Sequence, residues 1–307
     1  MKKDYAKYVR TKIVDTIAAE KTGREWRKGD GGRRHICLDL DDNFIDHERQ
    51  ENCNIKGDIF NEKIGYHIYS HSLNSSQVMC ISFFKKFFEK NEYQNVLLVA
   101  LKACGIEVAD NVAITNAIFE YVPDKNENTN FDFYMILSNG QHISFEIKYT
   151  EAEFGGIGKR KGDNPNKYGE KWEDYYKTLV KSCPYMKDSQ ECDNEYNCIR
   201  NAKLNPSACE KSEECQIYQF YSHYQINRNI SWAKKDTDIV VFLTPRENES
   251  LGKSRVYIDS FNNPNIKNLY WENLIEIVLK HAEQDEDLRT YYTKFKKKYF
   301  VFVPYEY

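Results

Sequence analysis

The stretch FDFYMILSNGQHISFEIKYTE, residues 131–151, constrains the fold more strongly than any other part of the chain. It contains two runs of apolar and aromatic residues, which are typical of β-strands, joined by the turn-forming tripeptide SNG at 138–140. This pattern predicts a β-hairpin. Three charged residues, Asp132, Glu146 and Lys148, interrupt the runs where a half-buried strand is expected to carry apolar side chains. Any fold for this chain must account for these charges.

The length of the turn decides whether the two carboxylates meet. A two-residue Asn-Gly loop pairs Asp132 with Ile147 and places the two acids on different faces of the hairpin. A three-residue loop, with Gly140 left-handed in a bulge, pairs Asp132 directly with Glu146. Directly opposed side chains are about 5 Å apart, which is close enough to share a cation.

Paired carboxylates on a half-buried sheet repel each other, so a positive charge must compensate them. Mg²⁺ or Mn²⁺ fits, because such hard ions take oxygen ligands: one or two carboxylates, waters and phosphate oxygens. Lys148 follows Glu146 by two residues and lies on the same face, where it can orient or help deprotonate an attacking water, or neutralise charge on a phosphate. The pattern predicts a metal-dependent site that cleaves phosphodiesters. A solvated sheet face with a Glu–Lys pair is the alternative.

This arrangement resembles the PD-(D/E)XK nuclease superfamily, which has the restriction-endonuclease-like fold. Asp132 matches the acid of the first strand and Glu146 to Lys148 match the Glu-x-Lys of the second, although NFD replaces the proline-containing start of the motif. The segments NSSQVMCISFF, FEY, FEIKYTE and YQINRN are also similar to a branch of uncharacterised restriction endonucleases. The resemblance implies that Asp132, Glu146 and the carbonyl of Ile147 bind the ion.

Further site residues follow from the same resemblance. Some superfamily members carry an additional metal-binding acid upstream, and Glu120 matches it; an exposed strand position is the alternative. Gln225 and Arg228 lie three residues apart on an expected helix, where related nucleases present a Gln or Arg to the scissile phosphate or its water. Such members often show Gln-x-x-x-Tyr, whereas position 229 is Asn. The alternative is the polar face of an amphipathic helix.

A glycine-rich basic segment, GIGKRKGDNPNKYGEKW, begins soon after the second strand of the hairpin. Its residues Lys159, Arg160 and Lys161 are predicted to contact the DNA backbone through phosphates, together with Arg228. A solvated surface loop is the alternative.

Four of the nine cysteines have a paired spacing in a polar segment of the chain. Cys192 and Cys198 are separated by five residues, as are Cys209 and Cys215. They could form a four-thiolate site for Zn²⁺ or an iron–sulfur cluster, although neither spacing is typical of a zinc finger. Reduced cysteines in a polar insert are the alternative.

The composition limits the classes of protein to which the chain can belong. Hydrophobic residues make up 41% and charged residues 30% of the 307 residues, so a packed core is expected. A net charge of −3 does not by itself indicate nucleic-acid binding. No run approaches the roughly 18 apolar residues of a membrane helix, and no signal peptide is recognisable. We therefore expect a cytoplasmic protein that does not contact a membrane.

The periodicity of the sequence predicts an α/β fold: a mixed central β-sheet flanked by helices, in agreement with a restriction-endonuclease-like core. Helices are expected at 4–20, 71–91, 93–105, 167–183, 215–235 and 271–281, and strands at 112–122, within 131–149, at 237–245 and at 254–261. A single nuclease domain, 1–307, would comprise an N-terminal extension (1–75), the core (76–182 and 216–283), a Cys-rich insert (183–215) and a C-terminal extension (284–307).

The sequence thus favours a Mg²⁺-dependent endonuclease acting on DNA, with a role in restriction or phage defence by analogy. RNA stays open as a substrate, and a homodimer would suit cleavage of both strands. Two other classes remain. One is a catalytically idle nucleic-acid-binding module of the same fold, and the other is an iron–sulfur or zinc protein that uses the Cys-rich insert.

Overall fold

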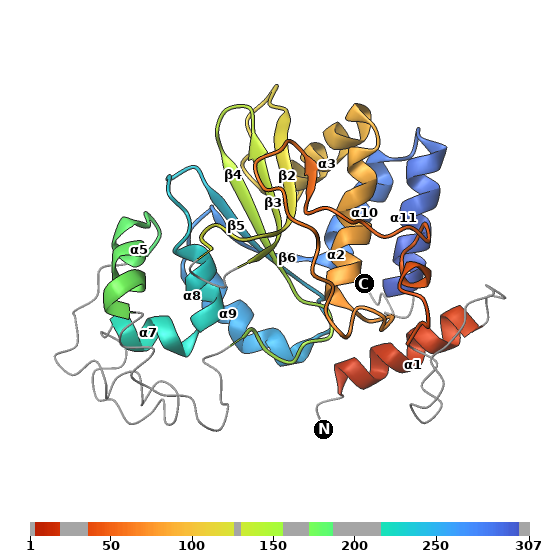
Figure 1. The fold of residues 1–307 in the computed structure, drawn as a ribbon, viewed down its shortest axis with the longest axis horizontal. Helices are drawn as coiled ribbons and strands as arrows, with labels where there is room; N and C mark the ends of the chain where they lie inside the picture. Colours follow the sequence, from red (N-terminus) through yellow and green to blue (C-terminus); the bar gives the residue numbers. More distant parts are fainter. Residues whose placement is uncertain (1–3, 19–35, 126–129, 156–171, 187–215, 301–307) are drawn as a thin grey trace.

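A six-stranded mixed β-sheet forms the centre of the protein in a computed structural model, which describes residues 4–18, 36–125, 130–155, 172–186 and 216–300 (Figure 1). The strands lie in the order in which they occur along the chain. Neighbours from β1 to β4 are antiparallel, and β4, β5 and β6 are parallel. The strands are Asn54–Lys56 (β1), Ile114–Tyr121 (β2), Phe131–Leu137 (β3), His142–Ile147 (β4), Ile239–Thr244 (β5) and Ile266–Tyr270 (β6).

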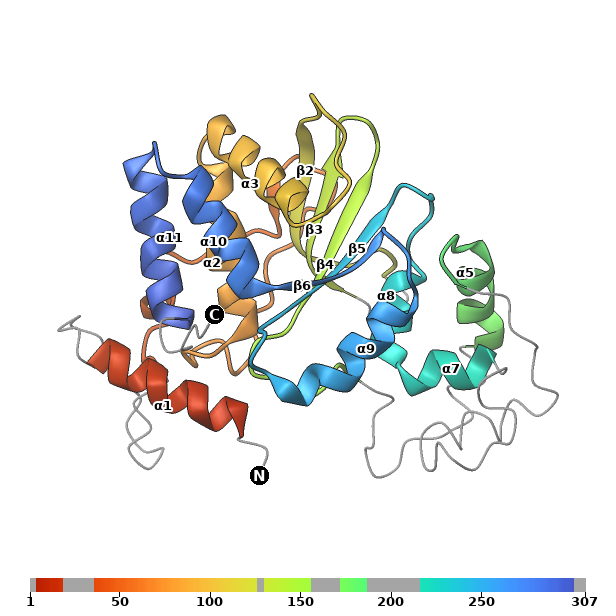
Figure 2. The same ribbon diagram turned by 180° about the vertical axis from the view of Figure 1, so that it is seen from behind.

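Helices cover both faces of this sheet, as the two opposite views show (Figures 1 and 2). One layer contains α2, α3, α10 and α11, with α1 packed beside α11, and the other contains α8 and α9, with α5 and α7 beyond them. The helices are Tyr5–Ala18 (α1), Ser76–Lys85 (α2), Asn91–Ala103 (α3), Lys177–Ser182 (α5), Gln216–Ser222 (α7), Tyr224–Ile230 (α8), Gly252–Ser260 (α9), Trp271–His281 (α10) and Glu286–Tyr299 (α11).

The side chains of β5 show how the sheet separates the two layers. Val241 and Leu243 point into the main core beneath α10, whereas Val240 and Phe242 pack on the opposite side against Ile226 of α8. Successive residues of a strand point to opposite faces, so a strand buried on both faces must be apolar throughout. The continuous apolar run of residues 237–245 predicts this central position, and the structure confirms it.

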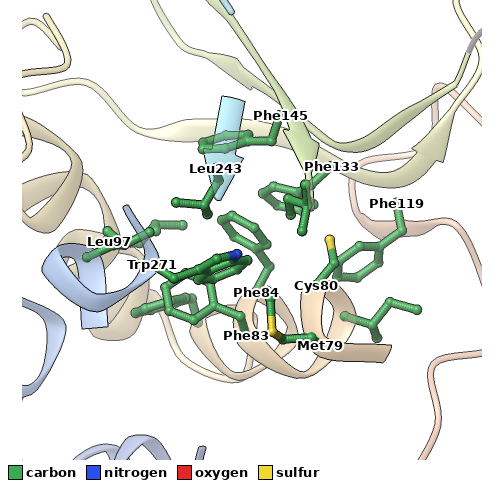
Figure 3. Packing of buried hydrophobic residues seen from close by; sticks show 14 of the residues in the cluster. Met79, Cys80, Phe83, Phe84, Leu97, Phe119, Phe133, Phe145, Leu243 and Trp271 are labelled. Atoms are coloured by element: carbon green, nitrogen blue, oxygen red, sulfur yellow. The ribbon is translucent and has the colours of Figure 1, made fainter. Parts of the chain in front are cut away.

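The main core is built around α2, which is buried on nearly all sides (Figure 3). Phe84 stacks on Phe133 of β3 with ring centroids 3.9 Å apart, and Phe83 meets Trp271 of α10 edge to face at 5.0 Å. The hydroxyl of Ser75 caps the helix by accepting a hydrogen bond from the Val78 N–H. This cap places the start of α2 beside the ends of β3 and β4.

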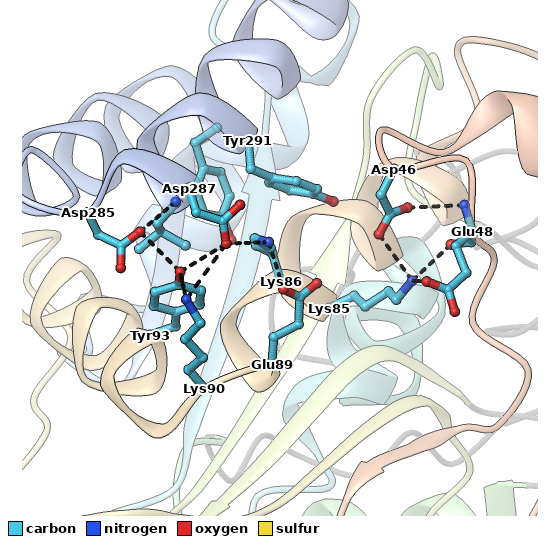
Figure 4. Close-up of polar contacts among 12 residues, drawn as sticks. Asp46, Glu48, Lys85, Lys86, Glu89, Lys90, Tyr93, Asp285, Asp287 and Tyr291 are labelled. Carbon is cyan, nitrogen blue, oxygen red and sulfur yellow. Dashed lines mark hydrogen bonds and ion pairs between the residues drawn. The ribbon is translucent and has the colours of Figure 1, made fainter.

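A network of charged side chains joins the helices of this layer at the edge of the core (Figure 4). We call Lys86, Glu89, Lys90, Asp285 and Asp287 the Lys86 cluster. Lys86 Nζ lies 2.6 Å from Glu89 and 3.0 Å from Asp287, and Lys90 Nζ lies 3.9 Å from Asp287. The cluster therefore links the end of α2 to the start of α11, two elements far apart in the sequence.

The predicted strand at 254–261 is wrong, because these residues belong to helix α9. The run contains Val256 and Ile258, whose branched side chains favour a strand. In the structure, Val256 is 71% exposed, while Leu251, Arg255 and Ile258 are buried. This spacing of four and three residues is helical. The last strand is instead β6, which is an edge strand with mostly half-buried residues and a weaker apolar pattern.

Two other features differ from the sequence predictions. The helix expected at 215–235 is divided into α7 and α8 at His223, and the short strand β1 was not predicted.

The helix α1, in the expected N-terminal extension, buries Val9 and Ile13 in the main core. Within the described part of the chain, the helices are too short or too polar to cross a membrane.

Candidate functional site

Of the two predicted loop lengths, two and three residues, the hairpin of β3 and β4 has the three-residue loop. Gly140 adopts a left-handed backbone with φ of +78°, and its N–H donates to the carbonyl of Leu137 at 2.9 Å. Phe133 lies opposite Phe145 in the resulting register. Continued by one residue, this register places Asp132 opposite Glu146, so the two acids face each other at the ends of the strands.

Asp132 is held at this position by the backbone of the neighbouring strand. The N–H of Ile147 donates to Asp132 Oδ2 at 2.6 Å. Loss of hydration on burial, followed by the charge of Glu146, raises the pKa of Asp132 well above its usual range, and Lys148 opposes this only in part. The ionised form of Asp132 is therefore destabilised in this environment, and a nearby positive charge would stabilise it.

Glu146 is fixed by three donors and has a side chain only 3% exposed. Its Oε1 accepts from Lys148 Nζ at 2.6 Å and from Gln225 Nε2 at 2.7 Å, and its Oε2 accepts from Asn229 Nδ2 at 2.6 Å. Gln225 is oriented in turn by the backbone of Gly155, which donates to its amide oxygen. Helix α8 thus holds the carboxylate of Glu146 in one orientation.

Lys148 comes directly after β4, and its backbone N–H still donates to the carbonyl of Leu243 at 3.0 Å. Its ammonium group lies 5.4 Å from the ring centroid of Phe154, with the side chain 11% exposed. Burial lowers the pKa of Lys148, but the charges of Glu146 and Asp132 outweigh burial and raise it overall. Lys148 is therefore a cation at neutral pH.

Glu120 lies next to this group on β2, in a left-handed backbone conformation with φ of +51°. Residues other than glycine rarely adopt this conformation, and it concentrates at functional sites. Its two carboxylate oxygens accept from the side-chain amides of Gln77 and Asn130. Burial is the main cause that raises the pKa of Glu120, with Glu146 adding to it.

A cavity of about 790 Å³ opens over Asp132, Glu146 and Lys148, and Glu120 is not among its lining residues. Its floor contains Asp132, Glu146, Ile147 and Lys148, and Gln225 lies at its side. A further part of the wall is formed by residues from α1, from the segment before α2 and from the first turn of α2, namely Arg10, His67, Ile68, Tyr69, Ser72, Asn74, Ser75, Ser76 and Gln77. The volume lies in the range of ligand-binding pockets.

The donor set of this cavity could hold a hard divalent cation. Asp132 and Glu146 supply two carboxylates, and the described ranges contain no group of three or more His, Cys, Asp or Glu side chains arranged for a metal. Two carboxylates suit Mg²⁺, which completes its shell with waters and phosphate oxygens, but are too few for a Zn²⁺ site built from side chains. The raised pKa of Asp132 agrees with a site that a cation would stabilise.

Within its described ranges, the structure does not bring the other predicted residues into the cavity. Arg228 does not line the cavity; its guanidinium lies 5.2 Å from the ring centroid of Tyr224. His223, at the start of α8, stacks on Tyr257 with ring centroids 3.6 Å apart. The following predicted residues lie outside the described part of the chain: Lys159, Arg160, Lys161, Cys192, Cys198, Cys209 and Cys215.

Sequence reasoning missed Asn229, Gln77 and Arg10. The signal for Asn229 was present, because it follows Gln225 by four residues and so shares one helical face with it. In the motif pattern, position 229 stands out only as a departure from a tyrosine. No local pattern marks Gln77 or Arg10, whose places on the cavity wall depend on how α1 and α2 pack.

The model of a family described as restriction endonuclease associating with ARP matches residues 14–300 of the chain. No curated protein and no solved structure matches it. The matched range contains all six strands and every cavity residue named above except Arg10. The mixed sheet with helices on both faces agrees with the restriction-endonuclease-like core that the sequence predicts. With nearly its whole length matched, the chain belongs to the REase-ARP family.

Proposed function

We propose that this restriction-endonuclease relative is a metal-dependent nuclease that hydrolyses phosphodiester bonds in DNA. The observation that carries the proposal is the position of Asp132, Glu146 and Lys148 together at the floor of one cavity. Family membership supports a nuclease with a role in restriction or defence. The residues supply the chemistry that such a reaction needs: anionic oxygens for a divalent ion and a fixed cation for the phosphate.

Asp132, Glu146 and the carbonyl of Ile147 would hold Mg²⁺ or Mn²⁺, and Glu120, whose oxygens accept from Gln77 and Asn130, would contribute directly or through water. Such an ion acts as a Lewis acid toward phosphate oxygens and lowers the pKa of bound water. The chain itself orients the acids. The Ile147 N–H positions Asp132, and Asn229 positions Glu146.

Lys148 supplies a fixed positive charge at the cavity floor. Its raised pKa keeps it protonated, so its proposed role is to stabilise negative charge on the phosphate and to orient the attacking water, and not to accept a proton. Gln225 donates to the same oxygen of Glu146 as Lys148 does, and it lies on the cavity wall. We assign Gln225 the role of holding this pair and of contacting the phosphate.

Binding of the DNA backbone is assigned to basic residues predicted from the sequence: Lys159, Arg160, Lys161 and Arg228. We add Arg10, a guanidinium on the cavity wall itself. A homodimer would bring two such sites to the two strands of a duplex.

The test is a cleavage assay on supercoiled, linear and single-stranded DNA, and on RNA, with Mg²⁺, Mn²⁺ or EDTA. Wild type is compared with Lys148→Ala and with Lys86→Ala, a control that removes another buried lysine paired with acids. We expect metal-dependent DNA cleavage that Lys148→Ala loses and Lys86→Ala keeps. Metal-dependent binding without cleavage would support an idle module instead. Equal activity in all three proteins would show that the active site lies outside this cavity.

A further inference from the structure

A tight turn at residues 67–70 presents two large apolar side chains to solvent on the cavity wall. Ile68 is 79% exposed and Tyr69 is 74% exposed, the highest values for large hydrophobic residues in the described ranges. Both line the cavity that contains Asp132 and Lys148. Exposed neighbouring apolar residues forgo the free energy of burial, and they mark interaction sites when they gather at a groove.

The turn that carries these side chains is held by hydrogen bonds on both sides. The N–H of Ser70 donates to the carbonyl of His67 at 2.9 Å, and the N–H of Ser72 donates to the carbonyl of Tyr69 at 2.9 Å. The amide of Asn43 donates to the carbonyls of Ser70 and Ser72. The exposure of Ile68 and Tyr69 is therefore a consequence of a defined backbone and not of a loose loop.

The same turn is connected to the site. The N–H of His67 donates to Gln77 Oε1 at 3.0 Å, and Gln77 Nε2 donates to Glu120 at 3.1 Å. The turn thus has a defined position relative to the acids at the cavity floor. A phosphodiester placed at that floor would bring its flanking nucleosides toward the wall that carries Ile68 and Tyr69.

The chemistry of the wall matches a nucleic acid at this place. Arg10 on the same wall suits phosphate, whereas Ile68 and Tyr69 offer no charge to phosphate and suit the flat apolar faces of bases. Apolar wedges between base steps and aromatic rings stacked on single bases are both established ways of holding opened nucleic acid.

We infer that Ile68 and Tyr69 form a wedge that contacts the bases beside the phosphodiester in the cavity. Tyr69 stacks on one base, and Ile68 fills the adjoining step. The inference rests on the proposed function, since it takes the cavity to bind nucleic acid. It assigns a substrate preference: strands whose bases are accessible, as in single-stranded or locally opened DNA, make this contact most readily.

The experiment measures binding of 2-aminopurine-labelled single-stranded and duplex DNA to the Lys148→Ala protein with Ca²⁺. The tested variant carries Ile68→Ala and Tyr69→Ala in addition. Tyr69→Phe, which keeps the ring, is the conservative variant. Val256→Ala is the matched control, because Val256 is also 71% exposed but lies on α9. All positions are at the surface, so the thermal unfolding midpoints should coincide.

We expect the double variant to bind about tenfold more weakly, the loss typical of one base–aromatic stack, and to lose the change in 2-aminopurine fluorescence. Tyr69→Phe and Val256→Ala should bind like their parent. Unchanged affinity and fluorescence in the double variant would overturn the wedge, while cleavage by wild type would still support the nuclease. Weakened binding in the double variant without any wild-type cleavage would support the wedge and refute the nuclease. Failure of the parent to bind either DNA would overturn the wedge, and the absence of wild-type cleavage as well would refute the nuclease.

Discussion

Lys86 and Lys148 are both nearly buried lysines that contact carboxylates, yet the acids around them differ in pKa. In the Lys86 cluster, a hydrogen bond from Lys86 is the main cause that lowers the pKa of Asp287. Beside Lys148, burial and the neighbouring acid raise the pKa of Asp132 well above its usual range.

The difference lies in hydration and in the number of cations. Asp287 has a side chain 57% exposed and two lysines within 4.0 Å, at 3.0 Å and 3.9 Å. At the candidate site, by contrast, Asp132, Glu146 and Glu151 share the buried Lys148. A balanced, hydrated cluster stabilises the packing of helices. An unbalanced, buried cluster requires a further positive charge, and this distinguishes the candidate site from a structural ion pair.

The largest expected effect is the loss of cleavage on removal of the site lysine. Lys148→Ala should reduce the rate of DNA cleavage by about 10³-fold or more, since it removes the fixed cation that faces the phosphate. Lys86→Ala should leave the rate unchanged. The measurement is a single-turnover cleavage rate with saturating enzyme. A similar loss in both variants would mean that the two clusters do not differ as we argue.

The second prediction concerns the divalent cation that Asp132 and Glu146 are proposed to bind. Mg²⁺ at about 100 times its Kd should stabilise the wild-type protein by about 2.7 kcal/mol. Asp132→Ala should lose most of this gain and all cleavage, because it removes a ligand. The measurement is thermal unfolding with and without Mg²⁺. An equal shift in the variant would place the ion away from Asp132.

The third prediction concerns the donors that hold Glu146. Asn229→Ala leaves Oε2 of a buried carboxylate without its amide donor, which should lower the free energy of unfolding by about 1–3 kcal/mol. Cleavage should fall by about tenfold, because Glu146 is no longer oriented. Urea unfolding and cleavage rates measure the two effects. An active and fully stable variant would show that Gln225 and Lys148 suffice to hold Glu146.

The smallest expected effect is on stability in the Lys86 cluster. Lys86→Met should lower the free energy of unfolding by about 1 kcal/mol at neutral pH, without an effect on cleavage. Asp287, which contacts Lys86, has a lowered pKa in the folded protein, so its contribution is present above the unfolded value of about 3.9 and is lost as the pH falls through its folded pKa. The difference between wild type and Lys86→Met should therefore disappear in acid.

That pH dependence is measured by urea unfolding of both proteins between pH 3 and pH 7. A difference that persists at the acidic end would mean that Lys86 stabilises the protein through its apolar stem, as buried lysine side chains can.

Much of the site was determined by the sequence alone. The turn tripeptide at 138–140 and the two-residue period of the strands are local properties, and together they place Asp132 opposite Glu146 once the three-residue loop is chosen. The cap at Ser75 and the buried strand β5 were predictable for the same reason. Each depends on contacts between residues close in the chain or on a periodicity that one segment carries by itself.

Other features depended on tertiary structure. The amides of Gln225 and Asn229 reach Glu146 from 79 and 83 residues away, and no local pattern specifies that approach. The run at 254–261 has the composition of a strand, but packing of one face against β6 made it a helix. Exposure of Ile68 and Tyr69 likewise follows from bonds to Asn43 and Gln77. Periodicity determines which side of an element is apolar, whereas topology decides which distant side chains meet there.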